Sequence, residues 1–320
     1  MLMQKRGYRI RDLGSSDLAA HCGQGKLYVD YGAASVRVRC PIKAFAQDFQ
    51  RVYGAFPASP EDGDFADYHV ELTPGNLVRT LVRPQCRFRI DGIELFDPFP
   101  ARNALPLFEW GVNWSLAHRA NQYVLLHSGA VASHRGAVIM AAPPGSGKST
   151  LTAAMMFRGF RLLSDEFGVL CPDTGQMLPM LKPIGLKNQA VEIVRSRFPD
   201  AVIGPVFTKT HKGNVAHLAP NDASVDAIRQ PATPALVVFP TYEAGAPVAA
   251  QRVPQEEAFG QLAFNSFNYH VLGAVGFEAI ARVIESCPAY RLRYSNLDDA
   301  IDRIEELLGD AHGTQTTGIH

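Results

Sequence analysis

The chain has 320 residues, of which 47% are apolar and 19% are charged, and this composition is that of an ordinary globular protein with a buried core. Its 31 basic and 31 acidic residues cancel, so net charge does not indicate nucleic acid or an anionic membrane as a partner. No apolar run is long enough to cross a bilayer, no charged-then-apolar leader opens the chain, and five scattered cysteines disfavour a disulfide framework, so we expect a cytoplasmic protein.

The first hundred residues are rich in predicted strands. Residues 1–25 show little periodicity, but apolar residues alternate from Leu27 to Cys40 around a break at Gly32, which predicts a hairpin. Three more strands are predicted by further alternation, at 68–72, 86–90 and 93–96. The pair Asp91-Gly92 favours a tight turn between the last two. We therefore predict an N-terminal module, residues 1–105, that binds a partner or substrate or mediates oligomerisation.

Residues 106–308 alternate between predicted helices and strands, which indicates an α/β domain. A helix is predicted from Pro106 to Gln122, and its two tryptophans, Trp110 and Trp114, are expected in a packed core. Strands are predicted at 123–126, 137–140, 160–164, 235–239 and 290–294, and helices at 151–157, 189–197, 256–264, 276–286 and 297–308. The polar residues 309–320 are expected to form a flexible tail.

The stretch Ala141–Thr150, with the sequence AAPPGSGKST, lies between a predicted strand and a predicted helix. Gly145 and Gly147 lack a Cβ atom, so the backbone can turn several N–H groups toward one point at the helix N-terminus, where an anion binds well. This is the context of a phosphate-binding loop, in which Pro144, Ser146 and Thr150 complete the cradle. Ala142 replaces the first glycine of the usual motif, and a simple Gly/Pro turn is the alternative.

Two side chains of this loop have separable predicted roles. The Lys148 ammonium is expected to bind the β and γ phosphates of a nucleoside triphosphate such as ATP. The Ser149 hydroxyl is expected to ligate a Mg²⁺ ion that bridges those phosphates.

Acidic and imidazole groups are expected beside the loop. Asp165 and Glu166 follow the strand that returns from the loop helix, and the carboxyl ends of parallel strands meet at one edge of a sheet. One carboxylate could accept the proton of an attacking hydroxyl and the other could hold Mg²⁺, with solvated acids as the alternative. His127 ends the predicted strand before the loop strand and could act with Asp165, or could be structural.

The stretch from His127 to Leu170 resembles the catalytic domain of HPr serine kinase/phosphorylase. It is still more similar to the bacterial HPr kinase-related (HprK-related) group, to which the kinases of lasso-peptide precursors are also similar. The resemblance rests on His-Ser-Gly-Ala-Val, Gly-Lys-Ser, Arg-Gly-Phe and Leu-Ser-Asp-Glu, and it extends loosely over 182–187, 210–217 and 265–269. It implies a P-loop kinase domain of the HPr kinase type, with His127 and Asp165 as the proton-handling pair.

The acidic pair and the segment for phosphorolysis depart from that family, and the roles of two lysines remain open. The family has two aspartates where this chain has Asp165-Glu166, and no segment here matches the one that serves phosphorolysis, which puts the reverse reaction in doubt. Lys187 and Lys212 lie in glycine-bearing basic loops; they could neutralise charge on the transferred group or could be solvated.

The sequence thus predicts an ATP-dependent kinase that transfers the γ-phosphoryl group to a hydroxyl, most simply a serine of a protein or peptide. Asp165 and His127 would handle the proton, and Ser149 and Glu166 would hold Mg²⁺. The resemblance also implies a peptide-modification pathway and a small peptide-chaperone-like companion. Alternatives are a nucleotide-gated binding protein without phosphotransfer and a small-metabolite kinase, and a homo-oligomer is left open.

Overall fold

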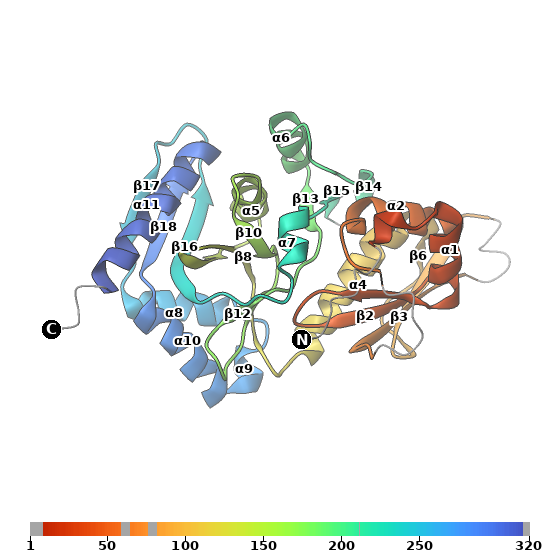
Figure 1. The fold of residues 1–320 in the computed structure, drawn as a ribbon, viewed down its shortest axis with the longest axis horizontal. Coiled ribbons are helices and arrows are strands. Elements are labelled where there is room, and N and C mark those ends of the chain that lie inside the picture. Colours follow the sequence, from red (N-terminus) through yellow and green to blue (C-terminus); the bar gives the residue numbers. More distant parts are fainter. Residues whose placement is uncertain (1–8, 59–64, 76–81, 211, 316–320) are drawn as a thin grey trace, which may run out of the picture. The chain divides into compact units, whose positions relative to one another are not determined.

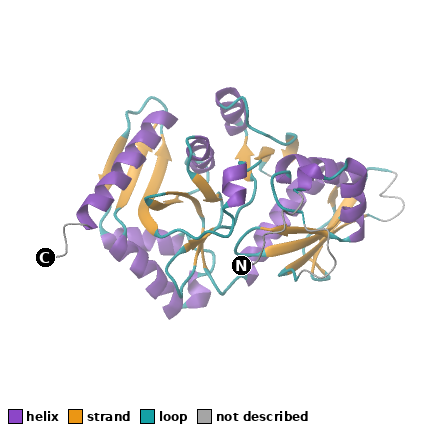
Figure 2. Ribbon diagram, viewed as in Figure 1, coloured by secondary structure: helices purple, strands orange, loops and turns teal. Residues whose placement is uncertain are grey.

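A computed structural model describes residues 9–58, 65–75, 82–210 and 212–315. The chain is a mixed α/β protein, as the sequence predicts, and it divides into two compact units, which we treat one at a time (Figures 1 and 2). The first unit combines residues up to Leu116 with Gly185–Arg195 and Pro199–Val225. It therefore takes up two later segments that the sequence analysis assigns to the domain 106–308. The second unit contains Ala117–Ile184, Ser196–Phe198 and the residues from Asp226 onward.

The first unit is built on a sheet whose strands follow the order β1-β2-β3-β4-β5, with β6 paired to β4. These strands are Leu27–Asp30, Ser35–Arg39, Tyr68–Pro74, Gln85–Ile90, Ile93–Glu94 and Phe99–Pro100 for β1 to β6. The predicted hairpin is confirmed, since β1 and β2 pair antiparallel. Asp91 and Gly92 join β4 to β5 with φ angles of 48° and 81°. The strands alternate buried and exposed residues because only one face of the sheet is covered.

Helices cover the buried face of this sheet. They are η1 (Ile10–Asp12), α1 (Ser15–Gln24), α2 (Lys43–Tyr53), η2 (Ala101–Asn103) and α4 (Ala104–Arg119). The prediction of irregular structure before residue 25 is wrong for α1, whose Leu18 and Cys22 are buried. Gly111 of α4 lies against the ring of Phe88 on β4, where a Cβ atom would clash. Trp110 is 36% exposed, so the expectation of a packed core does not hold for that side chain.

The later segments of the first unit form a second, three-stranded sheet with two helices. The order of that sheet is β13-β15-β14. The elements are β13 (Ile184–Lys187), α6 (Gln189–Arg197), β14 (Phe207–Thr210), β15 (Gly213–Leu218) and α7 (Asp222–Asp226). The Arg11 guanidinium donates two hydrogen bonds, of 2.8 and 2.7 Å, to the Asp222 carboxylate and so joins this part to the N-terminal segment. His211, within the loosely similar stretch 210–217, lies outside the described residues.

The second unit is built on a six-stranded sheet of order β10-β8-β9-β16-β18-β17, beside a small sheet of order β12-β11-β7. The strands of the large sheet are β8 (Ser128–Ser133), β9 (Gly136–Ala141), β10 (Arg161–Ser164), β16 (Pro234–Tyr242), β17 (Ala249–Arg252) and β18 (Ala289–Tyr294). Those of the small sheet are β7 (Val124–Leu126), β11 (Gly168–Leu170) and β12 (Met177–Leu178). β9, β16 and β18 run parallel to one another, whereas β8 is antiparallel to both β9 and β10.

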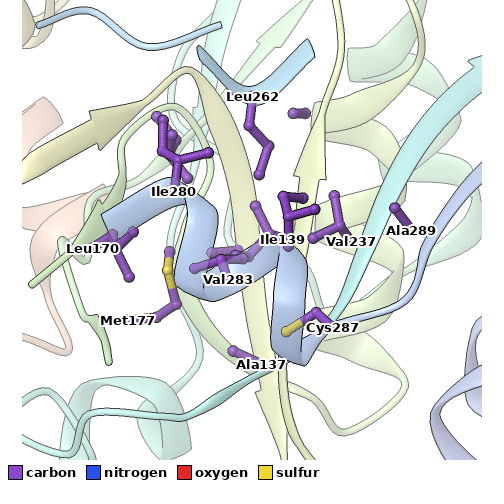
Figure 3. Packing of buried hydrophobic residues seen from close by; sticks show 14 of the residues in the cluster. Ala137, Ile139, Leu170, Met177, Val237, Leu262, Ile280, Val283, Cys287 and Ala289 are labelled. Atoms are coloured by element: carbon purple, nitrogen blue, oxygen red, sulfur yellow. The ribbon is translucent and has the colours of Figure 1, made fainter. Parts of the chain in front are cut away.

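Helices pack on both faces of the large sheet. They are α5 (Lys148–Phe157), α8 (Gln255–Phe264), α9 (Tyr269–Leu272), α10 (Ala274–Ser286) and α11 (Leu297–Gln315). On one face, Ile139 of β9 and Val237 of β16 belong to a buried cluster with Leu262 of α8. Ile280 and Val283 of α10 complete this part of the cluster (Figure 3). α5 packs on β8, and α11 contacts α5, β16 and β18.

The predicted helices and strands of this unit are present with small shifts at their ends. The last helix continues beyond Leu308 to Gln315, so only residues 316–320 of the expected tail lie outside the described residues. Within the described part of the chain, no helix combines the length and the apolar character needed to span a membrane.

Candidate functional site

The candidate phosphate loop occupies the connection between β9, which ends at Ala141, and α5, which begins at Lys148. Gly145 and Gly147 have φ angles of 89° and 87°, a left-handed region in which glycine is not strained. Gly147 is the N-cap of α5, and it has no side chain with which to satisfy the N–H groups of the first helical turn. Those N–H groups and the positive end of the helix dipole therefore face outward from the loop, which suits an anion.

The ends of β16 and β18 support this loop from one side. The Tyr242 N–H donates to the Ser146 carbonyl oxygen at 3.0 Å, and the Tyr294 hydroxyl donates to the Gly147 carbonyl oxygen at 3.3 Å. A Cβ atom on Gly147 would lie 2.5 Å from the Tyr294 hydroxyl oxygen, so the tyrosine packs directly against the loop. Burial raises the pKa of Tyr294, with a smaller contribution from Tyr242, so its hydroxyl stays protonated and can donate.

Lys148 is only 8% exposed although it carries a charge. Its Nζ atom donates a hydrogen bond to the His127 carbonyl oxygen at 3.3 Å, and the Lys148 carbonyl accepts one from the Thr152 hydroxyl at 2.9 Å. Gly129 on β8 leaves room for Thr152 and for the Lys148 stem, since a Cβ atom there would clash with the threonine hydroxyl. The ammonium is thus held beside the loop and next to the residue at which β8 begins.

Sheet topology brings three predicted site residues to one edge of the large sheet. Because β8 is antiparallel to β9 and β10, its amino end lies at the same edge as the carboxyl ends of those two strands. Ser128 pairs with Ala141, and Ala130 pairs with Ser164. His127 and Asp165 directly adjoin these paired ends, and the Lys148 side chain reaches the same edge through its hydrogen bond to the His127 carbonyl oxygen. β8 lies between β9 and β10, so Asp165 is one strand removed from the loop strand.

The position of His127 differs from the prediction in one respect. The sequence predicts that His127 ends the strand before the loop strand and reaches the edge with Asp165 if the two strands are neighbours, but that earlier strand, β7, belongs to the small sheet. The chain changes sheets at His127, because Leu126 pairs with Gly168 and Ser266, whereas Ser128 pairs with Ala141. His127 therefore precedes β8, and only the antiparallel direction of β8 brings it to the edge with Asp165.

The acidic pair Asp165-Glu166 lies in the turn after β10. The Phe167 N–H donates to the Ser164 hydroxyl at 2.9 Å and closes this turn. Both acidic residues are half-buried, and the Oδ1 atom of Asp165 is buried.

An aromatic contact that the sequence analysis misses joins His127 to the acidic turn. The Phe267 ring lies 5.3 Å from the His127 ring and is stacked on Phe167 at 4.7 Å between centroids. The His127 N–H donates to the Asn265 carbonyl oxygen at 2.5 Å, and the Asn268 side chain binds the backbone of Tyr123 and Leu125. The polar-aromatic pattern of residues 265–269 is a sequence signal for this role, because it interrupts an otherwise helical region.

Possible metal ligands are oxygen atoms. Ser149, in the first turn of α5, and Glu166 are both half-buried, and hydroxyl and carboxylate oxygens are ligands that Mg²⁺ prefers. Among the residues that the structure describes, no group of three or more His, Cys, Asp or Glu side chains could hold a metal ion by itself. The donor set fits an ion that takes its remaining ligands from phosphate and water.

The weak candidates Lys187 and Lys212 belong to the first unit, whereas the loop belongs to the second. Lys187 is exposed at the end of β13, and the Nζ atom of Lys212 lies 6.0 Å from the centre of the Trp110 ring.

Comparison of the chain with models of known protein families and with curated proteins found no match.

Proposed function

We propose that this protein is an ATP-dependent kinase that transfers the γ-phosphoryl group to a hydroxyl, with a serine of a protein or peptide as acceptor. The observation that carries the proposal is the meeting, at one edge of the large sheet, of a glycine-rich loop, a nearly buried lysine, a histidine and a carboxylate. The resemblance of residues 127–170 to the HPr kinase catalytic domain adds support.

Each residue of the candidate site has its own role in the proposed reaction. The loop N–H groups and Lys148 bind the phosphates and favour the charge that develops on them during transfer. Asp165 accepts the hydroxyl proton as the acceptor oxygen forms its bond to the γ-phosphorus atom and the bond from that phosphorus to the β-γ bridging oxygen breaks. His127, at the same edge of the sheet, positions the acceptor hydroxyl. Ser149 and Glu166 would hold a Mg²⁺ ion, which when bound neutralises phosphate charge.

The test is acceptor-dependent release of ADP by the full chain with ATP and Mg²⁺, together with mass spectrometry of the acceptor proteins in a lysate. Asp165→Asn should lower transfer by about 10²- to 10⁴-fold, because it removes the proton acceptor while preserving shape. It should leave nucleotide binding within about threefold, which is less than the contribution of one hydrogen bond. Asp173→Asn, at an exposed aspartate of the same unit, is the matched control.

Three outcomes would contradict the proposal. Unchanged transfer by Asp165→Asn would remove the assigned base. Slow hydrolysis that no acceptor stimulates would favour a nucleotide-gated binding protein, and phosphorylation of a metabolite alone would favour a small-molecule kinase.

A further inference from the structure

We propose that Tyr242 is the stacking platform for the nucleobase, so that the nucleotide lies across the carboxyl ends of β16 and β18. This inference rests on the proposed kinase function, because it takes the phosphate loop as the site of the triphosphate. It adds to that function the place of the nucleoside and the basis of its recognition. No residue of the phosphate-loop motif indicates where the nucleobase binds.

The first step concerns the direction of the nucleotide. The proposed reacting groups, His127 and Asp165, lie on the β8 and β10 side of the loop strand β9. The γ phosphate must point toward them, and in a nucleoside triphosphate the nucleoside is at the opposite end of the phosphate chain. It therefore extends over the other neighbour of β9, which is β16, and toward β18. Ligands of open α/β sheets bind outside the carboxyl ends of the parallel strands, and β9, β16 and β18 are parallel.

The second step concerns what lies at those ends. β16 ends at Tyr242 and β18 ends at Tyr294, and the two residues are paired in register. Neighbouring strands place paired residues on the same face, so the two rings meet, with centroids 5.9 Å apart and planes at 75°. Tyr294 is 1% exposed and supports its neighbour from within, whereas Tyr242 is 51% exposed.

The third step ties Tyr242 to the loop itself. Besides the hydrogen bond from its N–H group to Ser146, its Cβ atom would lie only 3.1 Å from a Cβ atom on Gly147. The ring therefore starts at the base of the phosphate loop and projects from it with half of its surface exposed. An exposed aromatic ring at the end of a strand is common, but here the hydrogen bond of its N–H group and the packing of its Cβ atom fix the base of the side chain at the loop.

This placement predicts weak discrimination between bases. Stacking on an aromatic ring needs only the π face that every base has, and no donor or acceptor pattern is read. Glu243 follows Tyr242, and Arg293 precedes Tyr294. A guanidinium nitrogen of Arg293 lies 3.5 Å from a carboxylate oxygen of Glu243, and strand alternation places Arg293 on the sheet face opposite to Tyr294. We expect ATP and GTP to bind with dissociation constants within about threefold of each other.

Calorimetric titration of the full chain in Mg²⁺ with ATP, GTP and inorganic tripolyphosphate tests the inference. Tyr242→Ala should weaken both nucleotides by about 5- to 50-fold, as expected for the loss of one stacked base, and leave tripolyphosphate within about twofold. Tyr242→Phe keeps the ring and should bind like the wild type. Tyr290→Ala, at the amino end of β18 and thus at the opposite edge, is the control for loss of a tyrosine.

The outcomes separate this inference from the kinase proposal, since none of them depends on phosphotransfer. Two results would show that the base does not stack on Tyr242: Tyr242→Ala binds ATP like the wild type, or the wild type binds tripolyphosphate as tightly as ATP. Neither result would contradict phosphate binding by the loop. If Tyr242→Ala weakens tripolyphosphate as much as ATP, Tyr242 acts through the shape of the loop, which also overturns the inference. If the wild type binds none of the three, both proposals fail.

Discussion

The Nζ atom of Lys148 donates a hydrogen bond to the carbonyl oxygen of His127, 21 residues earlier in the chain, at a distance of 3.3 Å. The contact links the residue that would bind phosphate to the residue that would position the acceptor. It also gives the nearly buried ammonium a partner before any ligand arrives, which offsets part of its desolvation cost.

Replacing Lys148 should weaken phosphate binding strongly. Lys148→Ala removes a charge-assisted hydrogen bond and is expected to weaken tripolyphosphate binding by about 10- to 150-fold, measured by titration calorimetry. Lys43→Ala is the matched control, because Lys43 is exposed at the start of α2 and has no proposed role in phosphate binding, and its effect should stay within about twofold. An equal loss in both variants would show that the loss at Lys148 does not come from a contact with phosphate.

The two loop glycines should respond differently to a methyl group. Gly145→Ala faces open space and costs only the strain of a left-handed alanine, about 1–2 kcal/mol in the loop. Gly147→Ala adds a clash with the Tyr294 hydroxyl and should weaken ATP binding further. Adding Tyr294→Phe removes the nearest clashing atom, so the double variant should recover part of the binding. Equal binding by the two single alanine variants would contradict the packing of Tyr294 against the loop.

Phe267 should act as a positioning residue through His127. Phe267→Ala removes the ring between His127 and Phe167, so we expect a lower kcat with an unchanged KM for ATP in the acceptor-dependent assay. Phe267→Tyr keeps the ring and should restore kcat. A parallel rise in the KM for ATP would indicate general damage to the unit instead.

The ion pair between Arg11 and Asp222 should make the first unit's stability depend on pH. The hydrogen bond and charge of Arg11 lower the pKa of Asp222, so the carboxylate stabilises the fold above its unfolded pKa, and this contribution is lost as pH falls through the folded pKa. Both side chains are about half exposed, which limits the effect to about 0.5–1 kcal/mol.

Urea unfolding of Arg11→Gln, Asp222→Asn and the double variant measures this coupling as a double-mutant cycle. The coupling should be present at neutral pH and absent once the solution is acidic enough to protonate the aspartate in both the folded and the unfolded state. A coupling that persists in acid would assign it to packing rather than to charge.

Local sequence patterns predict most elements of the second unit and the loop. Helix α8 ends where the sequence predicts, at Phe264, and begins one residue earlier than predicted, at Gln255, and the strand-loop-helix order around Gly145 and Gly147 is confirmed. These features depend on periodicity and on glycine conformation, both of which are local. Helix α2 was missed although Phe45, Phe49 and Val52 have helical spacing.

Features that depend on distant pairing could not be predicted. The sequence His-Ser-Gly at 127–129 marks the end of a strand but not a change of sheet, which follows from the pairing of Leu126 with Ser266 and Gly168. The support of the loop by Tyr294 joins residues 147 positions apart. Likewise, the membership of 199–225 in the first unit follows from contacts such as Arg11 with Asp222, which are 211 positions apart.

The discontinuous first unit has a consequence for biosynthesis. Its late segment supplies Asp222 for Arg11, and Gly204 packs its backbone against Val52 of α2, where a Cβ atom would lie 2.8 Å away. The ribosome must therefore translate past Val225, and through helix α5 of the other unit, before the first unit can close. A fragment that stops at Leu116 would lack the segment that packs against Val52 of α2, so we expect a stop codon or a fused reporter placed there to yield a product that aggregates more readily than the full chain.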